Sequence, residues 1–509
     1  MGVAVTPHHL ASDAAIQVMR SGGNAVDAAL TAIAVQGTVD PTTCGVGGDL
    51  FAIIHRPGEA APTVLNASGR AGSGATAAAV REAGHDTVPL RSHWSVTVPG
   101  CVDGFEALSE RYGSRSLGEL LAPAIAIAEA GFPAGPELAR ALGRIQPLIG
   151  DQPSAHALYP GGDPPAPDDQ LRRADYATTL RAIAADGRDA FYMGAPGQAI
   201  TAATDGTITS DDLDRRQADW VDPLGCDVFG HTAWTVPPNT QGYLTLAAAW
   251  IFEQLGPPRD PESPAFHHAA IEAYRSVAWE RDDLVADPDH APLSMDALVS
   301  PGRLSPLLDS ISMSQTGTWP TPGFAPGGTA YLCTMDDDGM GVSLIQSNFH
   351  GIGSTLSAGT TGVFLHNRGG GFNVEPGHPN EIAPGKRPLH TLSPTLWTKD
   401  GNLSMILGTR GGKFQPQLLL QVAASRLWAG LSPADAQNVP RWALPEFGPG
   451  SDSILEVEPG IDADGLARLG HRVTTVGGPQ EGWGPVSLID PAEGGAADPR
   501  VSSTSVATT

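Results

Sequence analysis

The sequence predicts an α+β protein in which helices pack in layers behind short strands. The first observation lies near the N-terminus, where two helical segments precede a glycine-rich turn and two apolar strands. The second is a change of pattern along the chain. Residues from about 103 to 290 are mainly helical in pattern, whereas short alternating strands dominate from residue 329 onward. With 509 residues, the chain can form one large layered domain or several smaller ones.

The N-terminal segments alternate helix signals with helix breakers. Residues 9–23 have an amphipathic pattern that stops at a Gly-Gly pair, and residues 24–39 have the alanine-rich, nearly all-apolar pattern of a buried helix. Asn24 is placed to be the N-cap of the second helix. Residues 41–55 predict a glycine turn that leads into a strand, and residues 63–68 predict the next strand.

Later segments continue this layered pattern. Helical spacing recurs at residues 104–113, 116–131, 178–187, 266–286 and 417–430. The stretch rich in Pro, Gly and Asp at 159–170 predicts a surface loop. The loop before residue 329 is polar and rich in helix breakers, so it is a candidate for a flexible, cleavable junction.

Composition narrows the classes of partner. The net charge of −25 and the pI of about 4.8 argue against binding to nucleic acid or to an anionic membrane and favour a small-molecule partner. The four cysteines are scattered without a CxxC pair, which predicts reduced and buried thiols. The first residues lack a basic stretch followed by an apolar run, and no later segment has the length of a membrane span, so we expect a cytoplasmic protein.

A predicted hairpin brings together candidate groups for acyl transfer. If Asp338-Gly339 forms its two-residue turn, Thr329 lies opposite Asn348 and beside Ser347. A nucleophilic hydroxyl, a second hydroxyl and an amide are suited to that chemistry. The alternative is purely structural, because threonine is a favoured strand residue and most strand threonines do no chemistry.

The Gly327-Gly328 pair before Thr329 favours a catalytic role for this threonine over a purely structural one. Glycine leaves the backbone free to adopt strained conformations and leaves the carbonyl group of Gly328 open to a neighbouring hydroxyl. Attack by Thr329 Oγ1, followed by hydrolysis, would free the α-amine of Thr329. That amine has a usual pKa of about 7.7 to 8.0 and can act as the general base for its own hydroxyl.

A second glycine pair, Gly411-Gly412, follows an apolar strand and precedes a helical segment. Backbone N–H groups at such a turn can bind an oxyanion, and Arg410 and Lys413 flank the pair. The same pattern is equally typical of an ordinary turn.

Two other patterns have weaker functional interpretations. The stretch 72–77 fits a dinucleotide-binding turn only superficially, because no acidic residue follows about 20 positions later. His267, His268 and Glu272 lack the HExxH spacing of a zinc site, so a packing or solvated helix is the better interpretation. The motifs imply no metal and no organic cofactor.

An ordered set of short segments covers nearly the whole chain and carries a family resemblance. The segments are SGGNAVDAA at 21–29, CGVGGD at 44–49, SVTVPGCVDGF at 95–105, RYG at 111–113, VPPNTQG at 236–242, GGT at 327–329, PGKRPLHTLSPTL at 384–396 and GTRGGKFQPQ at 408–417. In this order they resemble the γ-glutamyltranspeptidase family of self-processing N-terminal nucleophile hydrolases.

The resemblance implies a four-layer αββα sandwich and cleavage between Gly328 and Thr329. Residues 1–328 would form a large (α) subunit and residues 329–509 a small (β) subunit, together an αβ heterodimer. Whether this pair dimerises further is left open. Thr329 would be the nucleophile, Ser347 the assisting hydroxyl, and Gly411 and Gly412 the oxyanion-hole glycines.

The glutamate-recognition positions of true transpeptidases are occupied here by other residue types. By position from Thr329 they fall on Phe349, Arg368, Gly371 and the pair His390-Thr391, and a further arginine position falls near Ser68. Candidate substrate-binding residues are therefore Arg70, Asn348, His350, Arg368, His390, Thr391, Arg410 and Lys413, with His366 a further donor. Because arginine forks suit carboxylates, we expect a small anionic substrate.

These expectations combine into one leading hypothesis. It is a self-processing threonine hydrolase of the amidohydrolase or acylase branch, which cleaves an acyl bond through an acyl-Thr329 intermediate. That bond is an amide or, as in some relatives, a carbon–carbon bond next to a carbonyl. One alternative is a true γ-glutamyl hydrolase or transferase of glutathione-like substrates, and another is an uncleaved, non-catalytic binding or scaffold homologue.

Overall fold

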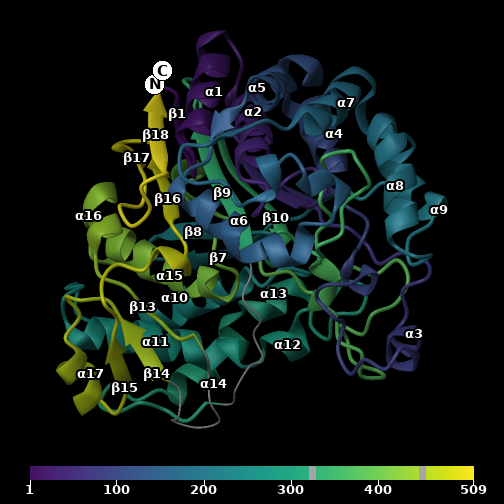
Figure 1. Ribbon diagram of the computed structural model, residues 1–509. Coiled ribbons are helices and arrows are strands. Elements are labelled where there is room, and N and C mark those ends of the chain that lie inside the picture. The colour runs from purple at the N-terminus through teal and green to yellow at the C-terminus, as the bar shows by residue number, and fades with distance from the viewer. Residues whose placement is uncertain (320–327, 446–453) are drawn as a thin grey trace.

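The computed structural model describes residues 1–319, 328–445 and 454–509, and its core is two stacked β-sheets (Figure 1). The first sheet has seven strands in the order β18 (Ser505–Thr508), β1 (Val3–Thr6), β9 (Gly328–Met335), β10 (Gly341–Phe349), β2 (Asp49–His55), β3 (Thr63–Ala67) and β6 (Asp219–Val221). Its neighbouring strands are antiparallel, so the chain begins and ends side by side at one edge.

The second sheet has six antiparallel strands. Their order is β17 (Gly494–Ala496), β16 (Val486–Asp490), β12 (Asn402–Thr409), β11 (Thr395–Lys399), β8 (His231–Thr235) and β7 (Leu224–Val228). A small sheet of β13 (Trp442–Ala443), β14 (Ile454–Val457) and β15 (Arg472–Thr475) lies apart from it, as does the pair β4 (Phe132–Pro133) and β5 (Gln170–Leu171).

Side-chain alternation along the strands builds three apolar layers. On β9, Tyr331 and Cys333 face the second sheet and pack with residues such as Leu396, whereas Ala330 and Leu332 face a helical layer. That layer contains α1 (His9–Arg20), α2 (Ala25–Val39), α4 (Cys101–Tyr112), α5 (Leu117–Ala130) and α7 (Ala174–Tyr192). The other face of the second sheet is covered by α10 (Tyr243–Leu255), α11 (Pro264–Ala278), α14 (Pro301–Asp309) and α15 (Gln415–Ala423).

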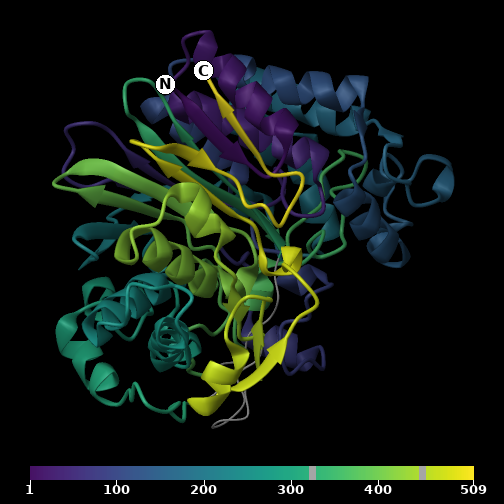
Figure 2. The same ribbon diagram turned by 90° about the vertical axis from the view of Figure 1, so that its left-hand side faces the viewer.

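The predicted αββα sandwich is therefore confirmed, with helices, two sheets and helices in succession (Figure 2). The remaining helices are shorter or peripheral: α3 (Ala77–Glu82), α6 (Pro136–Ile149), α8 (Ala195–Ala203), α9 (Ser210–Asp214), α12 (Arg281–Leu284), α13 (Met295–Leu298), α16 (Pro433–Asn438) and α17 (Ala463–Arg468). Every helix among the described residues is too short or too polar to cross a bilayer.

Several local predictions are confirmed. Asn24 caps α2 by accepting hydrogen bonds from the backbone N–H groups of Val26 and Asp27, and every residue of that helix is buried. All four cysteines are buried and reduced. The predicted helix at 266–286 is divided, because α11 ends at Ala278 and α12 begins at Arg281.

The predicted register of the β9–β10 hairpin is wrong by one residue. The turn has three residues, Asp337 to Gly339, and Gly339 adopts a left-handed φ of +88°. Met335 therefore pairs with Gly341, and the prediction assumed a two-residue turn. Within the predicted junction before residue 329, residues 320–327, which include Gly327, lie outside the described residues.

Candidate active site

A β-bulge places two polar side chains opposite Thr329. Ala330 pairs with Gln346 and Gly328 pairs with Phe349, so Ser347 and Asn348 together face the single residue Thr329. A bulge of this kind re-aims side chains and is common next to active sites. Thr329 consequently lies beside the hydroxyl of Ser347, as the sequence predicted, although the pairing that produces this neighbourhood differs.

The hydroxyls of Thr329 and Ser347 form a short hydrogen-bonded chain. Thr329 Oγ1 donates to Ser347 Oγ at 3.3 Å, and Ser347 Oγ donates to the carbonyl oxygen of Gly328 at 2.7 Å. The backbone N–H of Phe349 and Nη2 of Arg368 both donate to Ser347 Oγ, at 2.8 and 3.1 Å. Ser347 can thus accept a proton from Thr329 while it polarises the carbonyl that Thr329 would attack.

Thr329 lines a cavity of about 480 Å³, although only 1% of its surface is exposed. One wall is α6, whose side chains at helical spacing form an apolar stripe of Leu138, Ala141, Ile145 and Leu148. The polar lining consists of Asp40, Thr42, Thr43, Arg91, Glu137, Arg140, Arg144, His350, Arg410 and Glu481. The cavity therefore combines an apolar wall with four arginines and three carboxylates.

Gly411 lies on the same cavity, and its backbone is suited to bind an oxyanion. Its φ is +119°, and a Cβ atom there would lie 2.0 Å from the carbonyl oxygen of Trp483, so the position requires glycine. Within the described residues, the backbone N–H groups of Gly411 and Gly412 make no hydrogen bond. Unpaired N–H donors that face a cavity are what an oxyanion hole needs, and of the two glycines Gly411 lines the cavity that Thr329 also lines.

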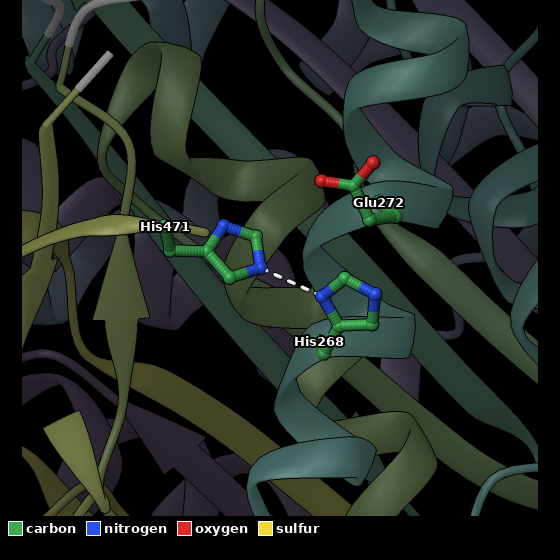
Figure 3. A group of neighbouring side chains, drawn as sticks. All are labelled: His268, Glu272 and His471. Carbon is green, nitrogen blue, oxygen red and sulfur yellow. Dashed lines mark hydrogen bonds between the residues drawn. The ribbon is translucent and has the colours of Figure 1, made fainter. Parts of the chain in front are cut away.

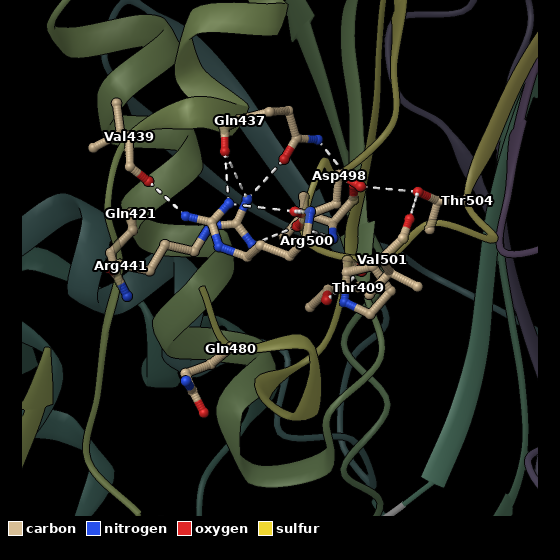
Figure 4. Close-up of polar contacts among 12 residues, drawn as sticks. Thr409, Gln421, Gln437, Val439, Arg441, Gln480, Asp498, Arg500, Val501 and Thr504 are labelled. Carbon is tan, nitrogen blue, oxygen red and sulfur yellow. Dashed lines mark hydrogen bonds and ion pairs between the residues drawn. The ribbon is translucent and has the colours of Figure 1, made fainter. Parts of the chain in front are cut away.

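A buried polar network supports the segment that packs on Gly411. Asp498 accepts a hydrogen bond from the backbone N–H of Val486 at 2.9 Å and pairs with Arg441 at 2.5 Å. Figure 4 shows Arg441 and Arg500 between Gln437 and Asp498. We call Arg441, Glu458, Asp498 and Arg500 the Asp498 network. It anchors β16, whose first residue follows closely after Trp483.

A second group of buried charges lies behind Ser347, and sequence reasoning missed its centre. We call Asp49, His366, Arg368 and His390 the Asp49 network. All four are 0% exposed, and Asp49 Oδ2 lies 3.0 Å from His390 Nε2, 3.2 Å from His366 Nδ1 and 3.9 Å from Arg368 Nε. Burial raises the pKa of Asp49, but His366 and His390 outweigh it and hold that pKa below its usual range.

The positions that transpeptidases use for glutamate recognition lie close together in this structure, but other residue types occupy them. The guanidinium of Arg368 stacks on Phe349 at 4.0 Å and donates to Thr391 Oγ1 at 3.2 Å. Phe349, Gly371 and Thr391 line a separate cavity of about 170 Å³. An aromatic ring and a buried guanidinium thus occupy the region between this second cavity and Ser347.

Of the other predicted substrate-binding residues, some line the Thr329 cavity and others do not. Arg410 lines the Thr329 cavity but pairs with Glu137 at 3.1 Å, and His350 lines it with a pKa lowered by burial and by nearby Arg91. Arg70 pairs with Asp219 at 2.6 Å and, among the described residues, does not line the cavity. Lys413 is buried, and its Nζ donates to the carbonyl oxygen of Pro445.

Asn348 and His390 also point away from the cavity among the residues described. Asn348 Nδ2 donates to the carbonyl oxygen of Pro41 at 3.3 Å, and His390 Nε2 contacts Asp49. Two arginines that sequence reasoning missed, Arg91 and Arg144, are exposed on the cavity instead. Neither one stood in a motif, so only the packing of α6 and of the loop at 91 could reveal them.

The segment considered for metal binding gains a third residue in the structure. His268 and Glu272 project from α11, and His471 comes from the segment just before β15 (Figure 3). His268 Nδ1 lies 2.7 Å from His471 Nε2, which is a hydrogen-bond distance and is shorter than the roughly 3.3 Å between two nitrogens on a tetrahedral zinc ion. Glu272 accepts hydrogen bonds from Arg275, Thr316, Gly317 and Trp319. The geometry fits a hydrogen-bonded contact between α11 and the segment before β15.

The αββα sandwich and a hydroxyl at the start of a central strand define an N-terminal nucleophile hydrolase. The family model for gamma-glutamyltranspeptidase matches residues 11–508. The chain therefore belongs to the γ-glutamyltranspeptidase family, and it is a hydrolase of that family.

Relatives within the family have several named activities. The oxamate amidohydrolase proenzyme of Klebsiella pneumoniae is 35% identical, with 98% of this chain and 97% of that one covered. The glutathione hydrolase-like YwrD proenzyme of Bacillus subtilis is 32% identical with the same coverage. The crystal structure of cephalosporin acylase from Bacillus halodurans has a TM-score of 0.92 and 33% identity and covers 99% of this chain and 95% of that one.

Proposed function

We propose that this chain is the precursor of a self-cleaving hydrolase in which Thr329 is the nucleophile and the substrate is a small amide that bears a carboxylate. The observation that carries the proposal is the hydrogen-bonded chain from Thr329 Oγ1 through Ser347 Oγ to the carbonyl oxygen of Gly328. The amide is favoured because relatives are named amidohydrolase, glutathione hydrolase and acylase.

The first reaction is cleavage of the chain itself. Thr329 Oγ1 attacks the carbonyl carbon of Gly328 and passes its proton to Ser347, whose hydroxyl donates to the developing oxyanion. The C–N bond breaks as the nitrogen is protonated, which leaves Gly328 esterified to Oγ1. Water then hydrolyses the ester and releases residues 1–328 with a carboxyl end and residues 329–509 with a free α-amine on Thr329.

The second reaction uses this new amine as a general base. The amine takes the proton of Oγ1, Oγ1 attacks the substrate carbonyl, and the leaving nitrogen receives the proton. In this proposal the unpaired N–H groups of Gly411 and Gly412 stabilise the oxyanion, a contribution typically worth a factor of 10² to 10³ in rate per donor. Water hydrolyses the acyl-Thr329 ester and restores the enzyme.

Cleavage of the precursor is tested by intact mass and N-terminal sequencing of three proteins. Wild type is expected as two chains, the smaller one beginning at Thr329. Thr329→Ala should remain one chain, and Thr329→Ser, which retains a hydroxyl, should be cleaved slowly. A wild type that stays intact at 52.6 kDa would instead favour the binding-protein alternative.

The cavity supports a substrate carboxylate at Arg91 and Arg144. Both arginines are exposed on the cavity and, within the described residues, neither makes a hydrogen bond or an ion pair. Arg140 and Arg410, by contrast, pair with Glu481 and Glu137. We therefore assign the carboxylate site to Arg91 and Arg144 in place of the expected cations Arg70, Arg368, Arg410 and Lys413. A γ-glutamyl substrate is less favoured, because Phe349 and Arg368 occupy two of the family's glutamate-recognition positions.

The charge preference is tested with two p-nitroanilides, one glutaryl and one pentanoyl, which differ by a carboxylate and a methyl group. In Arg91→Gln/Arg144→Gln we expect KM for the glutaryl compound to rise about tenfold, equivalent to about 1.4 kcal/mol, with little change for the pentanoyl compound. Arg468→Gln, which removes an exposed arginine outside the cavity lining, is the control. Equal effects on both compounds would contradict the carboxylate site. Faster release from γ-glutamyl-p-nitroanilide than from either compound would favour the γ-glutamyl alternative.

A further inference from the structure

Asp49 lies directly across the sheet from Ser347. The two residues are paired in the register of β2 and β10, so their side chains stand on the same face of the sheet. Asp49 Oδ1 accepts a hydrogen bond from the backbone N–H of Gly69 at 2.8 Å, which fixes the carboxylate group. Its other oxygen, Oδ2, is left facing His366, Arg368 and His390.

The hydrogen bonds of the two histidines define their protonation. His366 Nε2 lies 2.8 Å from the carbonyl oxygen of Thr97, which can only accept, so this nitrogen carries a proton. Its Nδ1 lies 3.2 Å from Asp49 Oδ2 and makes no hydrogen bond among the described residues. His390 donates through Nε2 and is otherwise neutral, because burial and nearby Arg368 lower its pKa to about 3. One carboxylate therefore faces two imidazoles and the guanidinium of Arg368.

Arg368 connects this carboxylate to the reacting hydroxyls. Its Nη2 donates to Ser347 Oγ at 3.1 Å and its Nη1 donates to Thr391 Oγ1 at 3.2 Å. Within the described residues, Asp49 is the one carboxylate within ion-pair distance of Arg368. Burial lowers the pKa of Arg368 to about 9, and Asp49 acts in the opposite direction to keep the guanidinium charged.

We propose that Asp49 is a positioning residue for the Thr329 reaction, one that holds a charged Arg368 against Ser347. This inference rests on the proposed function, since it assigns Asp49 a role in the same chemistry. As Ser347 Oγ gives its own proton to the oxygen of Gly328 and takes the proton of Thr329 Oγ1, partial negative charge develops in turn on the Gly328 oxygen, Ser347 Oγ and Thr329 Oγ1. A fixed cation that donates to Ser347 Oγ stabilises that charge, and its effect is large because the surroundings are buried.

The test uses cleavage of the Gly328–Thr329 bond as its readout, because that reaction requires no knowledge of the substrate. The full-length chain is synthesised in a cell-free system, and the fraction cleaved is followed with time on denaturing gels. Asp49→Asn and Arg368→Gln are each expected to slow cleavage about 100-fold. Because Asp49 acts through Arg368, the double variant should be no slower than the slower single variant.

The control variant is Asp490→Asn. Asp490 is also a buried carboxylate paired with an arginine, Arg426 at 2.7 Å, but it lies at the end of β16 and outside both cavity linings. We expect this variant to be cleaved at the wild-type rate. Circular dichroism of each variant checks that the comparison is made between folded proteins.

The outcomes separate this inference from the proposed function. If wild type is cleaved and Asp49→Asn is cleaved equally fast, or if the two single effects multiply in the double variant, Asp49 is not acting through Arg368. If Asp49→Asn does not fold, Arg368→Gln and Arg368→Lys decide instead. Wild-type speed in Arg368→Gln overturns the inference, whereas slow cleavage that Arg368→Lys partly restores supports it. An uncleaved wild type overturns the proposed function and this inference together.

Discussion

The Asp49 and Asp498 networks are both buried groups of charges, but their hydrogen bonds are completed to very different degrees. Arg500 donates five hydrogen bonds, to Glu458, Asp498 and the carbonyl oxygens of Gln437 and Val439. Within the described residues, Arg368 donates only two, and its Nε has no hydrogen-bond partner. A guanidinium has five N–H groups, so the first arginine is fully used and the second is not.

The other groups of the two networks differ in the same way. Asp498 accepts from Arg441, Arg500 and two backbone N–H groups, and Glu458 accepts from Arg500 and from two backbone N–H groups. In the Asp49 network, His366 Nδ1 and His390 Nδ1 have no hydrogen bond among the described residues. In the Asp498 network, Arg441 Nε is also without a partner among the described residues, but Arg500 and both carboxylates are well hydrogen-bonded. A network paired to this degree stabilises a single arrangement, whereas the less completely paired network beside Thr329 is able to respond to charge that develops there.

The largest effect that this comparison predicts is on stability, in Asp498→Asn. The substitution leaves Arg441, which is 2% exposed, and Arg500 short of a counter-charge, and breaking a buried ion pair in this way costs about 3–5 kcal/mol. We would measure the free energy of unfolding in urea, in a Thr329→Ala background that should keep the protein as one chain. Without the background substitution, Asp498→Asn protein that folds should still cleave at Gly328 at close to the wild-type rate.

A matched control for this measurement is Glu481→Gln. Glu481 also pairs with an arginine, Arg140, but the two side chains are 46% and 54% exposed. An exposed pair is screened by water, so we expect a change in unfolding free energy below about 1 kcal/mol. A similarly small change in Asp498→Asn would show that the Asp498 network is not a main source of stability.

Much of the fold was predictable, because it depends on local patterns. The capping group of Asn24 and the apolar run after it define α2, and the glycine turn and apolar strand that follow define β2. The proximity of Thr329 and Ser347 also followed from a hairpin pattern. The exact register of the hairpin could not be predicted from that pattern. It depends on a third turn residue and on a bulge at Ser347 and Asn348, and both depend on how the strands pack in the sheet.

The Asp49 network could not be predicted from local patterns. Asp49 closes a glycine-rich motif and opens a buried strand, which is an unusual place for an acid and was the available signal. Its partners His366 and His390 are more than 300 residues away, so only tertiary structure brings them together. The direction of long side chains is equally hard to predict, and Lys413 proved to be buried while Arg144 lines the cavity.

A smaller effect is predicted for the dependence of the unfolding free energy on pH. This effect distinguishes the two networks, because only the Asp49 network contains histidines. His390 has a pKa of about 3 in the folded protein and about 6.5 when unfolded. Between these values the unfolded chain binds the proton and the folded chain does not, so stability falls as pH decreases below about 6.5. By this linkage, lowering the pH from 7 to 5 costs about 2 kcal/mol through His390 alone.

His390→Gln should remove this contribution, because an amide can still donate to Asp49 but does not titrate. In the Thr329→Ala background, urea unfolding at pH 7 and pH 5 should therefore differ by about 2 kcal/mol less than in the parent. His8, His267 and His471, whose pKa values burial also lowers, account for part of the slope that remains. Exposed His156→Gln is the control and should leave the slope unchanged, as should Asp498→Asn. If His390→Gln retained the same pH dependence of unfolding free energy as the parent, His390 would already carry a second proton in the folded protein. The Asp49 network would then be more positively charged than the hydrogen bonds of its histidines indicate.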